Sequence, residues 1–177
     1  MTNFINFITL SRIILAPTIL IFIIFGNYFV SFLLFIFAGF TDYLDGYLAR
    51  KYNSESQLGE ILDPIADKIL VVFILIGISI ELDSYLIGFL SSCIISREIV
   101  VAALRDYSAR NNLLEKTKVT FLAKIKTTCQ LFTILLYLFA LTISFNLLIV
   151  LCDILLVTTT LITLFTGYQY VLNVLDK

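Results

Sequence analysis

Six apolar segments take up most of this 177-residue chain and limit what it can fold into. Each approaches the roughly 20 residues that a helix needs to cross about 30 Å of hydrocarbon. None alternates in the way that is typical of membrane strands. The sequence therefore predicts an all-α membrane protein with six transmembrane helices. The predicted spans are Leu10–Phe25, Phe29–Leu48, Ile61–Ile80, Tyr85–Leu104, Val119–Thr142 and Leu147–Leu172.

The composition supports lipid as the solvent of this chain. Hydrophobic residues make up 60% of it, whereas soluble domains are usually about 45–50% apolar. We expect a single membrane domain over residues 1–177, because the length leaves no room for a sizeable soluble domain. The first dozen residues, up to Arg12, can form a short interfacial helix before the first span.

Charge is distributed unevenly between the two ends of the predicted helices. All 12 Lys and Arg residues lie at one end or in the helix halves nearest to it. The connections at the other end, at 26–28, 81–84 and 144–146, are neutral or acidic. The positive-inside rule then predicts a multi-pass protein of the cytoplasmic (inner) membrane, with both termini on the cytoplasmic side.

Four aspartates, Asp42, Asp45, Asp63 and Asp67, lie in segments that otherwise resemble membrane. An aspartate near the bilayer centre costs about 2.5–3.5 kcal/mol on insertion scales, so the group needs a neutralising partner. Helical spacing places each pair on one face of its span. Because the two spans are sequential and antiparallel, we expect the carboxylates to converge at their cytoplasmic ends. Hard oxygen ligands suit Mg²⁺, Mn²⁺ or Ca²⁺, and four carboxylates suit a two-metal site.

Residues around the aspartates fit a phosphate-bearing ligand. Gly46 and Gly59 allow a substrate to approach the backbone closely. Arg50 supplies a planar, permanently charged fork that matches phosphate. The chain has no histidine, which excludes Ser-His-Asp triads and the usual zinc sites. Any proton transfer must therefore involve Asp, Glu, Lys, Tyr or Cys side chains.

The segment from Asp42 to Asp67 reads D-x2-D-G-x2-A-R-x8-G-x3-D-x3-D. It resembles, at every fixed position, the signature of the CDP-alcohol phosphatidyltransferases, which are membrane enzymes with six transmembrane helices. They displace CMP from a CDP-linked lipid or alcohol with a hydroxyl acceptor, and known members are commonly homodimers. The resemblance implies that the four aspartates hold two Mg²⁺ or Mn²⁺ ions, with Asp67 also acting as the base. It implies that Gly46, Arg50 and Ser56 contact the CDP portion.

Other segments extend the resemblance. The segment from Asn6 through Thr9 to Arg12 is similar to the amino-terminal segment of the family, so we assign Asn6 and Thr9, with Gly59, to CDP-lipid binding. The segments 96–105, 124–128 and 163–170 resemble those of members that use glycerol 3-phosphate as acceptor. The expected substrates are therefore CDP-diacylglycerol and glycerol 3-phosphate, and no nucleic-acid partner is expected.

A basic cluster supports a phosphate-bearing acceptor independently of the resemblance. Arg97 and Arg105 lie within about 80° of each other on the fourth helix, and Lys124 and Lys126 begin the fifth. Such cations suit glycerol 3-phosphate. We expect no ion pair between Arg97 and Glu98, because adjacent helical residues point apart.

Three alternatives remain open at this point. The same family chemistry can use another acceptor, such as phosphatidylglycerol or inositol phosphate. Intramembrane carboxylates also mark the ion pathways of coupled transporters, although these usually have midplane sites and inverted repeats, and no repeat is visible here. A structural membrane scaffold is the third option, but it has no need for four converging acids.

Overall fold

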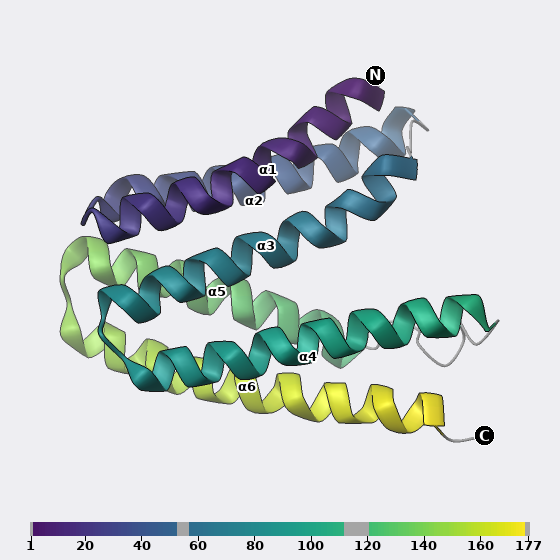
Figure 1. Ribbon diagram of the computed structural model, residues 1–177. Helices are drawn as coiled ribbons and strands as arrows, with labels where there is room; N and C mark the ends of the chain where they lie inside the picture. The colour runs from purple at the N-terminus through teal and green to yellow at the C-terminus, as the bar shows by residue number, and fades with distance from the viewer. Residues whose placement is uncertain (1, 53–56, 112–120, 176–177) are drawn as a thin grey trace.

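The computed structural model describes residues 2–52, 57–111 and 121–175, which form six α-helices and no strand (Figure 1). Where the structure describes them, the predicted apolar segments fall on six different helices, so the all-α prediction is confirmed. The helices are α1 (Thr2–Ile24), α2 (Tyr28–Tyr52), α3 (Gln57–Glu81), α4 (Tyr85–Arg110), α5 (Phe121–Ile143) and α6 (Asn146–Leu175).

The amino-terminal segment differs from the prediction. Helix α1 is continuous from Thr2 to Ile24, so the expected interfacial helix up to Arg12 is not a separate element. No glycine or proline lies between Thr2 and Arg12 to break the helix.

Helix α4 also extends further than expected, because the predicted span ends at Leu104 and the helix ends at Arg110. Arg110 pairs with Asp106 one turn earlier at 2.9 Å. The Asn111 side chain then caps the helix by donating to the Tyr107 carbonyl at 2.8 Å. Local polar contacts therefore continue the helix six residues beyond Leu104.

Within the described ranges, three helical segments are long and apolar enough to cross a membrane: Tyr85–Arg110, Ile125–Ile143 and Asn146–Val174. The apolar stretches of α1 and α2, at Ile8–Ile24 and Tyr28–Leu44, are shorter. Large apolar side chains also cover the outer surface, and Leu161 of α6 is 62% exposed. A surface of this kind is typical of a membrane protein.

Short connections set the arrangement of the helices. Positive φ angles at Gly26 (73°), Asp83 (44°) and Ser144 (52°) end α1, α3 and α5 tightly. These three turns lie at one end of the bundle, at the left of Figure 1, and the start of α1 and the end of α6 lie at the other. Helix α1 packs on α2 and α3, α4 packs on α3 and α6, and α5 packs on α2, α3 and α6.

Helices α1 and α3 approach each other closely at Gly77. A Cβ atom there would lie 2.9 Å from Leu20 Cδ1 and 3.0 Å from Ile23 Cδ1. Ile74 and Ile78 on the same face of α3 are completely buried. The close packing of α1 on α3 positions the charged residues that both helices carry further along.

We expect Gly77→Val to lower the free energy of unfolding by about 2 kcal/mol, because extra methyl groups overfill a packed core. The matched control is Gly39→Val, since a Cβ atom at Gly39 meets nothing within 4 Å. Thermal unfolding followed by circular dichroism in detergent measures both. Equal effects of the two substitutions would contradict the packing argument.

Candidate functional site

Arg12 is the centre of the charged site. This α1 side chain is completely buried, and its guanidinium group contacts carboxylates from two other helices. Nη1 donates to Asp42 of α2 and, at 2.7 Å, to Asp67 of α3. Nη2 lies 3.5 Å from Asp63 Oδ1. Three of the four predicted aspartates therefore converge on one point, as the helical spacing predicted.

Thr9 joins the same cluster from one turn earlier on α1. Its buried hydroxyl donates to Asp63 Oδ1 at 2.7 Å. Sequence analysis assigned Thr9 to substrate binding, and the structure places it beside the aspartates. Gly59, at the start of α3, is buried, and Gly46 of α2 is half-buried.

The carboxylates remain accessible although the arginine is not. The side chains of Asp42, Asp63 and Asp67 are between 44% and 56% exposed, whereas that of Arg12 is 0% exposed. The cluster therefore has a closed side, formed by α1, and an open side lined by acids. A cationic ligand can approach the open side.

The chemistry of the donor set fits a divalent metal. Among the described side chains, no group of three or more His, Cys, Asp and Glu residues is spaced to hold a metal ion as it stands. The side chain of Asp45 lies outside that described set. Carboxylates from two helices nevertheless converge on one cationic group, and carboxylate oxygen is the ligand that Mg²⁺ and Mn²⁺ prefer. The two-metal site stays a prediction.

Sequence reasoning missed the role of Arg12. It treated this residue as one of the basic residues that set topology and as part of a family-like segment. The available signal was a charged side chain inside the apolar run Leu10–Phe25. Such a residue almost always faces a partner in the bundle interior.

A second charged cluster joins α4 to α5. Glu98 Oε1 accepts from Arg97 Nη1 at 3.0 Å and from Lys126 Nζ. Arg97 and Lys126 are both buried. The expectation that Arg97 and Glu98 form no ion pair is therefore wrong. Their Cβ atoms point apart, but the long arginine side chain can fold back to its neighbour.

The two clusters lie at similar depth in the bundle. Arg97 comes 12 residues after the start of α4, and Asp67 comes 14 residues before the end of α3. At about 1.5 Å per residue, they lie about 18 Å and 21 Å from the turn between these helices. Lys68, next to Asp67, interacts electrostatically with both Glu98 and Lys126. The basic cluster around Glu98 therefore extends to Lys68 of α3.

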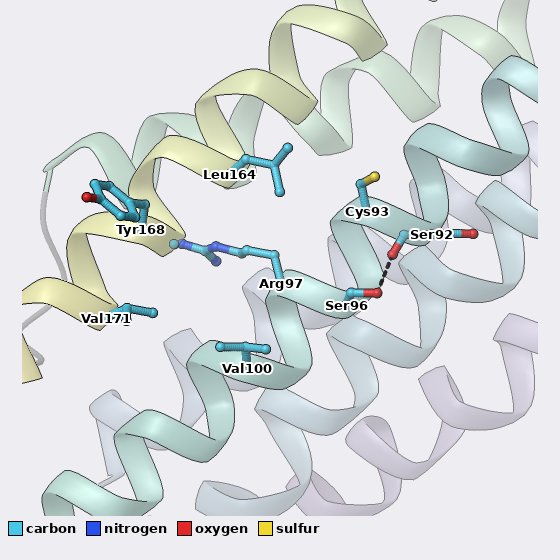
Figure 2. Close-up of a pocket in the computed structure, with 9 residues that line it drawn as sticks. Ser92, Cys93, Ser96, Arg97, Val100, Leu164, Tyr168 and Val171 are labelled. Atoms are coloured by element: carbon cyan, nitrogen blue, oxygen red, sulfur yellow. Dashed lines mark hydrogen bonds between the residues drawn. The ribbon is translucent and has the colours of Figure 1, made fainter. Parts of the chain in front are cut away.

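Helices α4 and α6 form a separate hollow of about 430 Å³, away from the aspartates. Figure 2 shows the Arg97 side chain extending from α4 toward Tyr168 on α6. Arg105, two turns beyond Arg97, is exposed and donates to the Tyr170 hydroxyl at 3.0 Å. The predicted acceptor residues Arg97 and Arg105 thus both point toward α6.

Several predicted site residues have side chains outside the described part of the structure. Their backbone positions are in α1 for Asn6, in α2 for Asp45 and Arg50, and in α5 for Lys124, whereas Ser56 is not described at all.

The family model of the CDP-alcohol phosphatidyltransferases matches residues 2–169. The chain belongs to this family. A relative from Haemophilus influenzae is 40% identical over 128 residues, which is 71% of this chain and 69% of the relative. Relatives from Salmonella choleraesuis and Escherichia coli K12 are each 34% identical, over 73% of this chain and 72% of their own length. All three are named CDP-diacylglycerol–glycerol-3-phosphate 3-phosphatidyltransferase.

For this phosphatidyltransferase, we expect Arg12→Lys to lower the free energy of unfolding by about 2 kcal/mol. An ammonium group keeps the charge but cannot reproduce a fork shared among three carboxylates. The control is Arg110→Lys, whose exposed pair with Asp106 contributes about 0.5 kcal/mol or less. Thermal unfolding with a chelator present measures both, and similar losses would refute the central role of Arg12.

Proposed function

We propose that this phosphatidyltransferase transfers the phosphatidyl group of CDP-diacylglycerol to glycerol 3-phosphate, giving phosphatidylglycerophosphate and CMP. The observation that carries the proposal is the aspartate cluster at Arg12 together with a buried basic cluster at similar depth in the bundle. The printed names of relatives at 34–40% identity support the same donor and acceptor.

The catalytic chemistry follows from charge and proton balance. Two Mg²⁺ or Mn²⁺ ions on Asp42, Asp45, Asp63 and Asp67 would supply the charge neutralisation that pyrophosphate cleavage needs. A carboxylate oxygen of Asp67 takes the proton from the acceptor hydroxyl as that oxygen attacks the lipid-side phosphorus. The bond from this phosphorus to the CMP oxygen breaks, and CMP leaves with the electron pair. Attack is direct and in line, with no covalent enzyme intermediate.

The donor binds beside the aspartates. Gly46 and Gly59 let the nucleotide approach the backbone, and Arg50 pairs with phosphate. Asn6, Thr9 and Ser56 complete this set by the family resemblance. Thr9 is the member with a described side-chain contact, to Asp63, so its contribution includes holding that carboxylate in place.

The acceptor binds at the basic cluster. Lys68, Arg97 and Lys126 bring three positive charges near the single carboxylate of Glu98. The positive charge that Glu98 leaves unbalanced matches the phosphate of glycerol 3-phosphate. Arg105 and Lys124 extend the same basic region. Phosphatidylglycerol or inositol phosphate as acceptor is the alternative within the family.

For its setting, we propose six transmembrane helices in the cytoplasmic membrane, with the active site and both termini on the cytoplasmic side. The support is that the start of α1 and the end of α6 lie at the end of the bundle opposite the neutral and acidic turns (Figure 1). The homodimer implied by the family resemblance belongs to the same proposal.

The purified enzyme with Mg²⁺ or Mn²⁺, CDP-diacylglycerol and glycerol 3-phosphate is expected to release CMP and form phosphatidylglycerophosphate, identified by mass spectrometry. Asp67→Asn removes the base and should abolish turnover while the protein stays folded. Asp106→Asn, on the exposed surface of α4, is the control and should keep wild-type activity. Full activity of Asp67→Asn, or a burst of CMP without acceptor, would contradict the mechanism.

Metal binding should be detectable without turnover. Saturating Mn²⁺ in the absence of substrate is expected to raise the melting temperature, since a ligand at 100 times its Kd stabilises the native state by about 2.7 kcal/mol. Asp63→Asn should reduce this increment, whereas Asp106→Asn should keep it. An identical melting temperature in Mn²⁺ and in EDTA would rule out the metal site.

A further inference from the structure

Three residues of α6 hold the two arginines of α4. Thr166 Oγ1 accepts a hydrogen bond from Arg97 Nη2 at 2.9 Å. The Tyr170 hydroxyl accepts one from Arg105 Nη2 at 3.0 Å. Both α6 side chains are buried, with 1% and 2% exposure. Each arginine therefore contacts a rigid hydroxyl on the neighbouring helix.

Gly167, between these two residues, allows Arg97 to lie against α6. A Cβ atom at Gly167 would lie 2.7 Å from Arg97 Cγ and 3.1 Å from Arg97 Nε. The stem of the arginine thus fills the space of the missing side chain. Any larger residue at this position would displace Arg97.

The ring of Tyr170 is shared by both arginines. Its centroid lies 5.9 Å from Arg97 Cζ and 5.3 Å from Arg105 Cζ, within the range of cation–π attraction. Val101 and Leu104, on the face of α4 between the arginines, pack against the ring. The ring is therefore fixed, and it fixes the directions of two cations that lie eight residues apart.

We propose that Thr166, Gly167 and Tyr170 are positioning residues for the acceptor. They act through Arg97 and Arg105, holding the two guanidinium groups ready for a phosphate monoester, and this role rests on the proposed function. Arginine side chains lose rotamer freedom when they bind a ligand, and residues that fix them in advance reduce that loss. Weakening the α6 contacts should therefore weaken acceptor binding and leave donor binding unchanged.

Tyr170→Phe removes the hydroxyl contact to Arg105 and keeps the ring. We expect the KM for glycerol 3-phosphate to rise about five- to tenfold, as for the loss of one ordinary hydrogen bond. The KM for CDP-diacylglycerol and the melting temperature should stay at wild-type values. Tyr85→Phe is the matched control, because Tyr85 is 91% exposed at the far end of α4, and it should leave every parameter unchanged.

Thr166→Val and Thr166→Ser separate the hydroxyl contact from packing. Valine keeps the volume and loses the acceptor for Arg97, whereas serine keeps the hydroxyl and loses a methyl group. The KM for glycerol 3-phosphate should rise several-fold in the valine variant and stay near the wild-type value in the serine variant.

The outcomes distinguish this inference from the function on which it rests. A wild-type enzyme active with glycerol 3-phosphate, together with an unchanged acceptor KM in Tyr170→Phe and Thr166→Val, would overturn the positioning role alone. Equal rises in the KM for donor and acceptor would show a structural role and would overturn it as well. A wild-type enzyme that is inactive with glycerol 3-phosphate would overturn both proposals.

Discussion

The contact of Arg12 with three carboxylates is the interaction on which the rest of the site depends. A buried cation without partners costs several kcal/mol, so α1 can bury Arg12 only where acids meet it. Those acids come from α2 and α3, and the meeting point fixes the relative height of all three helices. The same contact relieves repulsion among the aspartates, which can then stay close together with their outer sides exposed.

Charge divides this membrane protein into two halves. Helices α1 to α3 bring the acids together, whereas α4 and α5 carry Arg97 and Lys126 around Glu98. Lys68 lies next to Asp67 in α3 and interacts electrostatically with Glu98 and Lys126 of the basic half. This division suits a reaction that brings a pyrophosphate and a second phosphate compound together. Family membership decides for such an enzyme and against the ion-coupled transporter that the carboxylates alone left open.

The sequence predicted what depends on local periodicity. Hydropathy located the helices, and spacings of three and four residues predicted that Asp42, Asp63 and Asp67 converge. Contacts between distant segments were not predictable in this way. Arg97 contacts Thr166, which lies 69 residues further along the sequence. Nothing in the sequence near either residue indicates that the two meet. The Arg97–Glu98 pair was missed for a different reason, because the direction of a Cβ atom does not limit where a long side chain ends.

The pairing of Arg97 and Lys126 with Glu98 bears on how an acceptor could use them. Without a bound anion, two buried cations need a carboxylate, and Glu98 supplies it. If this carboxylate cancelled the whole positive charge, an incoming phosphate would have to displace it. One carboxylate balances only one of the two cations, and Lys68 adds a third nearby, so positive charge remains while Glu98 stays in place. The proposed acceptor phosphate can therefore join the cluster without breaking the ion pairs that connect α4 to α5.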